Sequence, residues 1–350
     1  MPSVGSQNGV TVSRGSAPWP AQFGSVRDEF SALRSTCGVF HRTDQVKLRL
    51  TGTDRVRWLN GMITNNIRDL APKHGVYGFL LNPQGHILGD LAAYNQSDAI
   101  MVSTEASQLE KILATFDHYI IMDDVEVANV SDFSATVGLV GPKSATVLAA
   151  AEIAMLPTQP LEIADQAWQN LHPVSVVRGE YEAFPSFEIW IAPMYVAKLR
   201  EALQTAGAVL VGQKALELYR VAMGTPLYGQ DIRERDLPQE TEQQRALNFN
   251  KGCYIGQEIV ERIRSRGNVH RKFTGFKLNG TPPAPGAKIQ SQGKEVGEIT
   301  STAVIPAPGE GQAVALGYIR REFAVPGKEI QLEGATATVA DLPFTDLLTP

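Results

Sequence analysis

Cys253 is placed where the chemistry of a thiol would differ from that of an ordinary cysteine. It lies within the octapeptide K-G-C-Y-I-G-Q-E, residues 251–258. Downstream, apolar residues at 259, 260 and 263 alternate with charged ones and predict an amphipathic helix that ends before Gly267. The positive end of a helix dipole and the Lys251 cation would both favour thiolate over thiol. Cys253 is therefore a candidate reactive residue, the alternative being the small buried hydrophobe that a lone cysteine often is.

The composition limits the class of protein. With 350 residues, of which 43% are apolar and 20% charged, the chain is expected to form two or three domains of a soluble globular protein. Its net charge of -5 argues against broad nucleic-acid binding, and no apolar run approaches the roughly 20 residues that span a bilayer. Residues 1–22 are rich in Ser, Gly and Pro and predict a flexible tail without the apolar segment of a signal peptide.

The cysteine count bears on both compartment and metal chemistry. Two cysteines are too few for a disulfide framework and indicate a reducing, cytoplasmic location. No Cys-x-x-Cys or His-x-x-x-His spacing is present, so no metal site is predicted. A single chain of this kind could not hold an iron–sulfur cluster by four thiolates. A factor that assists cluster assembly by other means remains compatible with the sequence.

The elements that must position these groups mix helices and strands without strict alternation, which favours an α+β fold over a doubly wound parallel sheet. A hairpin is predicted from 77–81 and 87–94, with N-P-Q-G at 82–85 as its turn. Residues 273–346 are rich in Gly and Pro with short Val/Ile strands, which predicts a β-barrel or sandwich. We expect two subdomains within 23–268, dividing near 135–210, and a C-terminal β-barrel domain over 269–350.

The octapeptide, in the context N-F-x-K-G-C-Y-I-G-Q-E, closely resembles the signature of the YgfZ-type folate-binding proteins, relatives of the glycine-cleavage T-protein (aminomethyltransferase). The similarity extends over roughly residues 25–345. It implies a folate-binding fold of mixed sheets and helices around a central cavity, with a C-terminal barrel. It also implies that Lys251 and Cys253 are functionally important.

Four further residues match positions of the folate site in that family. Asp90, in G-H-I-L-G-D-L, looks like the second acid of a G-G-x-x-D-D-L segment, which faces the reactive nitrogens of tetrahydrofolate; Gly89 replaces the first acid. Tyr77 matches an aromatic residue that lines the site. Glu188, in F-E-I, matches the carboxylate that holds the pteridine edge, and Arg220, in L-Y-R-V, matches an arginine of the same pocket.

These residue types suit tetrahydrofolate or a 5,10-substituted derivative. Glu188 could accept two parallel hydrogen bonds from the N–H edge of the pterin, and Asp90 could exchange a proton near N5 and N10. The basic side chains within 262–272 could meet the glutamate tail. Taken without the resemblance, Asp90 is an ordinary turn or solvated residue, Arg220 could pair with Glu217 on a helix surface, and the basic run is a solvated face or an RNA contact.

The resemblance implies first a tetrahydrofolate-binding protein of the YgfZ type that assists assembly or repair of iron–sulfur clusters. Its partners would be folate and iron–sulfur assembly proteins or client enzymes, with no membrane and no nucleic acid. A folate-dependent aminomethyltransferase or related one-carbon transferase is an alternative, because Asp90 is retained. Against it stand Gly89 and the segment F-H-R-T-D-Q at 40–45, which replaces the T-protein's F-D-V-S-H-M. A tRNA-modification factor is a third hypothesis.

Overall fold

The computed structural model describes residues 18–181, 184–267, 269–291, 293–307, 309, 311–332 and 334–349. Of the flexible tail predicted over 1–22, residues 1–17 therefore lie outside the described residues. None of the helices in the described part combines the length and the apolar character that crossing a bilayer requires.

The strands of the amino-terminal two thirds form two separate sheets. Their bounds are β1 Gly38–His41, β2 Gln45–Thr51, β3 Gly75–Leu81, β4 Ile87–Asn95, β5 Ile100–Glu105, β6 Glu126–Asn129, β7 Ala135–Val140, β8 Ile163–Trp168, β9 His172–Arg178, β10 Ser186–Ile191 and β11 Val209–Leu210. One sheet has the order β3-β4-β5-β2-β6, and the other has the order β11-β1-β7-β10-β9-β8. All neighbouring strands are antiparallel except β1 and β11.

The carboxyl-terminal strands close into a barrel with the order β12-β15-β14-β13-β16-β17. Their bounds are β12 Arg271–Gly280, β13 Lys288–Ser291, β14 Lys294–Ile305, β15 Gln312–Arg320, β16 Glu329–Leu332 and β17 Ala335–Ala340. A closed barrel leaves no free sheet edge, which suits short strands with glycine turns. The α+β class and the C-terminal barrel expected from the sequence are confirmed.

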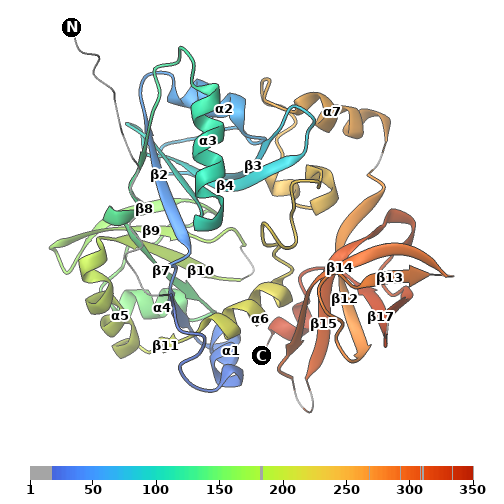
Figure 1. The fold of residues 1–350 in the computed structure, drawn as a ribbon. Helices are drawn as coiled ribbons and strands as arrows, with labels where there is room; N and C mark the ends of the chain where they lie inside the picture. The colour runs from blue at the N-terminus through green and yellow to red at the C-terminus, as the bar shows by residue number, and fades with distance from the viewer. Residues whose placement is uncertain are drawn as a thin grey trace, which may run out of the picture.

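The helices cover the two sheets and connect them to the barrel (Figure 1). Their bounds are α1 Val26–Ser35, α2 Arg55–Met62, α3 Leu109–Tyr119, α4 Ser144–Ala150, α5 Val196–Thr205, α6 Gln213–Met223, α7 Gln257–Arg266 and α8 Thr345–Leu348. Helices α2 and α3 lie with the five-stranded sheet, α4 and α5 with the six-stranded sheet, and α6 lies beside the barrel. The expected helix before Gly267 is confirmed as α7, and the expected hairpin as β3–β4.

One apolar core joins the barrel to the rest of the molecule. It contains Phe30 of α1, Val221 of α6, Leu316 of β15 and Leu347 of α8, all less than a tenth exposed. Because this core is shared, separating the barrel would expose apolar surface on both sides. The barrel is therefore held in a defined position beside the two sheets.

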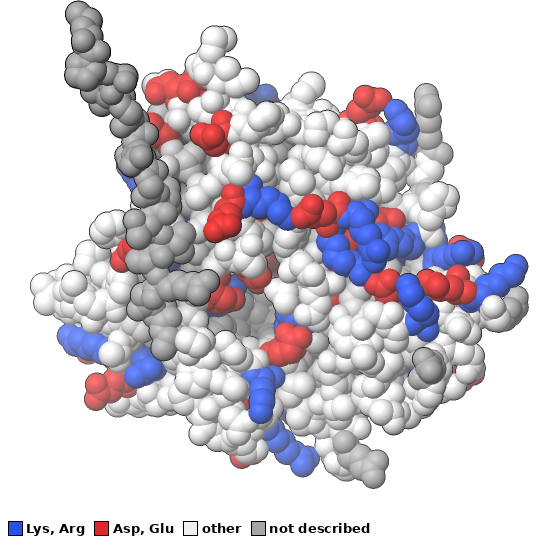
Figure 2. Space-filling model, in the orientation of Figure 1, with Lys and Arg blue, Asp and Glu red and all other residues white. Residues whose placement is uncertain are grey.

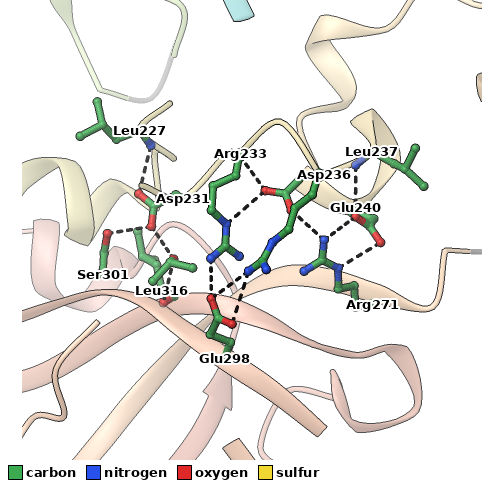
Figure 3. A network of polar contacts seen from close by, with 12 residues as sticks. Leu227, Asp231, Arg233, Asp236, Leu237, Glu240, Arg271, Glu298, Ser301 and Leu316 are labelled. Atoms are coloured by element: carbon green, nitrogen blue, oxygen red, sulfur yellow. Dashed lines mark hydrogen bonds and ion pairs between the residues drawn. The ribbon is translucent and has the colours of Figure 1, made fainter. Parts of the chain in front are cut away.

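Buried charges fasten the segment after α6 to the barrel, as Figure 3 shows. Arg271 of β12 donates to Asp236 at 2.7 Å and to Glu240 at 2.9 Å, and Asp236 is fully buried. Glu298 of β14 pairs with Arg233 and Arg235. A buried carboxylate is tolerated when paired in this way, and the shared partners leave Asp236 and Arg271 each with a second contact.

The β3–β4 turn packs against the start of α7. Gly85 and Gly256 both have positive φ, at 77° and 81°. A Cβ on Gly85 would lie 2.7 Å from Ile259 of α7, and one on Gly256 would lie 2.6 Å from the carbonyl oxygen of Asn82. Only glycine permits both the left-handed backbone and this approach. The contact carries the loop with Cys253 to the turn end of the hairpin.

Candidate functional site

A cavity of about 320 Å³ is lined by residues of both sheets and of the segment between α6 and α7. The five-stranded sheet contributes Tyr77, Asp90 and Glu105, and the six-stranded sheet contributes Phe187 and Glu188. Three of the residues expected at a folate site, Tyr77, Asp90 and Glu188, thus line one space. Additional rings on its wall give the cavity apolar faces beside its charges; they belong to Phe40, Tyr94, Tyr181 and Tyr228.

Both carboxylate oxygens of Asp90 are held by hydrogen bonds. The Tyr77 hydroxyl donates to Oδ2 at 2.6 Å, and the Gln108 amide donates to Oδ1 at 2.7 Å. The Gln108 side chain also accepts from the Asp90 backbone N–H at 2.9 Å. Burial, with the Asp90 charge adding to it, raises the pKa of Tyr77 well above its usual value, so its hydroxyl remains a donor. Asp90 is therefore fixed in orientation before any ligand enters.

The sequence did not identify Gln108 as a site residue. The one signal related to it was Gly89, the glycine that replaces the first acid. A Cβ at position 89 would lie 2.9 Å from the Gln108 side-chain oxygen. The glycine that replaces the first acid of the family pattern thus makes room for the amide that holds the second. Gln108 is almost completely buried just before α3.

Glu188 lies on β10 with three donor side chains around it. Arg42 donates to Oε1 at 3.2 Å, and the Gln45 amide reaches both oxygens at 3.1 and 3.2 Å. The Trp190 indole donates to Oε2 at 3.3 Å. Arg42 and Gln45 come from the 40–45 segment that departs from the family pattern. The departure therefore supplies new partners to the carboxylate expected to hold a pterin.

A buried relay fixes the direction of the Gln45 amide. In its charged form Lys47 donates to the Thr136 hydroxyl at 2.5 Å, and because an ammonium only donates, that hydroxyl then sends its own hydrogen to Gln45 Oε1, also at 2.5 Å. The amide nitrogen of Gln45 then faces Glu188. Burial lowers the pKa of Lys47 to about 7, with the Glu188 carboxylate opposing that change.

Glu105 adds a second cavity acid next to the Asp90 site. Burial raises the pKa of its carboxyl to about 7, against the attraction of Arg42. Among the described residues no hydrogen bond or ion pair reaches this carboxylate. Glu105 can therefore gain or lose a proton near neutral pH without breaking a contact. It sits at the end of β5, and no motif singled it out in the sequence.

Arg245 separates the central cavity from a second one. Its guanidinium lies 4.3 Å from the centre of the Tyr77 ring and 5.2 Å from that of Tyr181, and it pairs with Glu180. Arg245 and Tyr181 also line the neighbouring cavity of about 390 Å³, which reaches Lys272 and the barrel. The two spaces thus meet at this arginine.

Arg220 is placed outside the lining of the central cavity. Its guanidinium donates to Asp231 at 2.7 Å, to Ser301 of the barrel at 2.9 Å and to Glu217. It also donates to the Thr225 carbonyl at 2.7 Å, and Thr225 does line the cavity. Through these contacts Arg220 links α6 to the following loop and to the barrel.

Lys251 and Cys253 point to different environments. The Lys251 ammonium is buried and donates to the carbonyls of Asn60, Ile63 and Asn65 at 2.5, 2.6 and 2.8 Å, at the carboxyl end of α2. Burial lowers its pKa to about 7, and the nearby Arg68 charge acts in the same direction. The three carbonyl acceptors favour the charged form. Cys253 is exposed, three residues before the N-cap of α7, and does not line the cavity. Its reactivity stays a prediction.

The basic run of 262–272 does not form one free cationic surface. Arg262 pairs with Glu258 at 2.8 Å, Arg264 with Glu261 at 3.6 Å, and Lys272 with Glu242 at 3.4 Å. Arg271 belongs to the buried network with Asp236, and the side chain of Arg266 lies outside the described set. On the face drawn in Figure 2, basic and acidic side chains are interleaved in a band. Such interleaving gives no support to the RNA hypothesis.

Metal coordination has no obvious place in the described part of the chain. No group of three or more His, Cys, Asp or Glu side chains there is arranged to hold a metal ion.

Comparison with known proteins gives a consistent result. The family described as GCVT N-terminal domain matches residues 3–251, and the Glycine cleavage T-protein C-terminal barrel domain matches residues 271–346. An aminomethyltransferase of Halothermothrix orenii is 29% identical, over 93% of each chain. Another, of Lysinibacillus sphaericus, is 28% identical over 92% of this chain and 89% of its own. The solved glycine cleavage system aminomethyltransferase T from Bartonella henselae has a TM-score of 0.81 at 23% identity, covering 91% of this chain and 89% of its own, which shows a common fold.

Proposed function

Because the chain belongs to the glycine cleavage T-protein family, we propose that its central cavity binds tetrahydrofolate, or a 5,10-substituted derivative, and presents it to Asp90. The observation that carries this proposal is the joint placement of Glu188 and Asp90 in one cavity, on different sheets. Glu188 would accept the N–H edge of the pterin. Asp90, oriented by Tyr77 and Gln108, would hold or exchange a proton near N5 and N10.

The bound folate would have a path for its tail. The second cavity shares Tyr181 and Arg245 with the first and continues to Lys272. The anionic glutamates would run along this path toward the two cations, Arg245 and Lys272. This path uses one of the five basic side chains that the sequence suggested and adds Arg245, which it did not.

The relatives favour one reaction, aminomethyl transfer to the folate. The similar proteins named above are called aminomethyltransferases and match this chain over nearly its whole length. Asp90 is the residue that would serve the reacting nitrogens, and Glu105 is a second acid that can exchange a proton near neutral pH. We therefore propose a folate-dependent aminomethyl or related one-carbon transferase as the function that the comparisons support best.

Two measurements test this function separately. Isothermal titration with tetrahydrofolate should show binding to the wild type and a clear loss in Glu188→Ala. A Lys277→Ala variant is the matched control, because Lys277 is a barrel residue paired with Asp346. Formation of methylenetetrahydrofolate from an aminomethylated lipoyl carrier should then fall strongly in Asp90→Asn while folate binding persists. Absence of folate binding by the wild type would refute the site, and binding without product would refute the transferase.

The octapeptide supports a second candidate, the YgfZ-type role in iron–sulfur cluster assembly or repair. Its lysine anchors the loop on α2 while its cysteine stays exposed, as a thiol that must meet a partner would require. The test is reactivation of an iron–sulfur enzyme by purified wild type and Cys253→Ser. Equal reactivation by the two proteins would remove the cysteine from this role.

A further inference from the structure

The Arg42–Glu188 pair faces the central cavity as a donor beside an acceptor. Both residues line it, and their side chains are 29% and 22% exposed. The contact between the guanidinium and Oε1 measures 3.2 Å, longer than the usual 2.7–2.9 Å of a charge-assisted hydrogen bond. The pair is thus accessible to a ligand, and its contact is weak enough to be exchanged.

Glu188 cannot accept a pterin without releasing a present partner. A carboxylate offers about four acceptor positions. The three donor side chains Arg42, Gln45 and Trp190 already make four contacts to its two oxygens. Two parallel N–H donors of a pterin edge would therefore compete with at least one of these side chains.

Arg42 is the partner that can move. Gln45 is held through Thr136 to the buried Lys47 ammonium, and Trp190 is itself almost buried. The other contact of Arg42 is to Asp44, at 3.4 Å, and the Asp44 side chain is 60% exposed. A solvent-screened pair of this kind contributes little to holding a side chain.

The chemistry of the pterin edge defines where Arg42 would go. The 2-amino group and N3–H are donors, and the adjacent O4 is an acceptor. When N3–H takes Oε1, the oxygen that Arg42 contacts, and the 2-amino group takes Oε2, O4 comes to lie beside the position that Arg42 occupies. We propose that Arg42 donates to O4 and so makes the cavity specific for 4-oxo over 4-amino pterins, an inference that rests on the proposed folate site. Arg42 is thereby a specificity-determining residue supplied by the segment that departs from the family pattern.

A 4-amino pterin would meet the wrong partner at this position. Its amino group at C4 would place donor against donor at the guanidinium. A site built to bind one group rejects an analogue that leaves its donors unpaired. The expected contribution of Arg42 to the preference for the 4-oxo ring is about tenfold to a hundredfold, the range for one hydrogen bond to a charged group.

The test compares tetrahydrofolate with 4-amino-4-deoxytetrahydrofolate by isothermal titration under reducing conditions. The two ligands differ at C4 and also at N3, which carries a hydrogen in the 4-oxo ring and none in the neutral 4-amino ring, so Glu188 contributes part of any preference. The readout is the ratio of their dissociation constants, which a general structural disturbance would leave unchanged. Wild type should prefer tetrahydrofolate by more than tenfold, and Arg42→Met should lower that ratio by about tenfold, leaving the part that the N3–H contact to Glu188 contributes. Arg42→Lys retains a donor and should keep part of the preference. Arg49→Met, on the adjoining strand β2 and paired with exposed Asp98, is the matched control and should keep the wild-type ratio.

The outcomes separate this inference from the proposed function. A wild type that binds tetrahydrofolate without preferring it, or an Arg42→Met variant that keeps the full preference, overturns the role of Arg42 alone. A wild type that binds neither ligand overturns the folate site and this inference together. If Arg42→Met does not fold, the donor-free Arg42→Ala variant takes its place: a ratio lowered by about tenfold supports the role, and the full wild-type ratio overturns it.

Discussion

Replacing Lys251 by methionine distinguishes a structural lysine from one that activates Cys253. In the structure the ammonium donates to three carbonyls at the end of α2, while the cysteine two residues on is exposed. Methionine keeps the apolar stem and its packing but has no donor. We therefore expect Lys251→Met to destabilise the fold and to leave the thiol chemistry almost unchanged.

The expected destabilisation follows from the three hydrogen bonds. Each bond to a charged donor contributes about 1.5–3 kcal/mol, and burying an ammonium costs several kcal/mol that methionine does not incur. The difference leaves about 2–4 kcal/mol, measured as a lower urea midpoint at unchanged slope. If instead the cation activated the Cys253 thiol, its loss would slow alkylation at pH 7 by about threefold, because the thiolate would become scarcer but also more nucleophilic.

Alkylation of the native protein reports on Cys253 with little interference. Cys37 is fully buried, and burial raises its pKa to about 11, with the Ser144 hydroxyl opposing slightly. Iodoacetamide kinetics at pH 7, with Cys253→Ser as the blank, should give Lys251→Met a rate within about twofold of wild type. A threefold or larger fall in rate with no change in the urea midpoint would refute the structural assignment of Lys251.

Three further results are expected. Between pH 5 and 8 the wild type should lose about 3 kcal/mol of unfolding free energy relative to Glu105→Gln, because folding raises the pKa of the Glu105 carboxyl from 4.5 to about 7. This stabilising contribution is complete below about pH 4.5 and is lost as pH rises through 7. A difference in urea midpoint between the two proteins that is the same at pH 5 and pH 8 would contradict it. Asp236→Ala should destabilise by about 1–3 kcal/mol in urea unfolding, because it removes a fully buried acceptor of Arg271 and of the Arg233 backbone N–H while Glu240 still pairs with Arg271; a loss below about 0.5 kcal/mol would show that this carboxylate is not needed. Lys272→Ala should weaken titrated binding of triglutamyl tetrahydrofolate more than that of the monoglutamate, whereas Lys277→Ala should affect neither; equal weakening of both ligands would exclude the tail path.

The local elements could be predicted because they depend on neighbours in the chain. Alternation and a glycine turn predicted the β3–β4 hairpin, and the spacing of apolar residues together with Gly267 predicted α7. The β8–β9 hairpin was not predicted, because β8 has the sequence I-A-D-Q-A-W, whose central residues have low strand propensity. Strand identity there depends on pairing with β9, which no local pattern contains.

Residue types in the site were available from the sequence, but their partners were not. Asp90, Tyr77 and Glu188 could be named by motif, whereas Gln108, Arg42 and Arg245 come from other segments and act through contacts that no motif contains. Motif matching likewise could not distinguish Glu188 from Arg220. Glu188 lines the cavity, whereas the Arg220 guanidinium is engaged by Asp231 and the barrel.

The amino-acid sequence by itself determined the alternating strands, the glycine turns and the chemical groups that the chain carries, because these follow from periodicity, backbone freedom and composition. Tertiary structure alone decided which groups meet. It turned the Lys251 ammonium onto three carbonyls contributed from almost 190 positions earlier in the chain and left the Cys253 thiol at the surface. Burial and contacts between distant segments set the charge and direction of each side chain, and neither is encoded in the spacing of a motif.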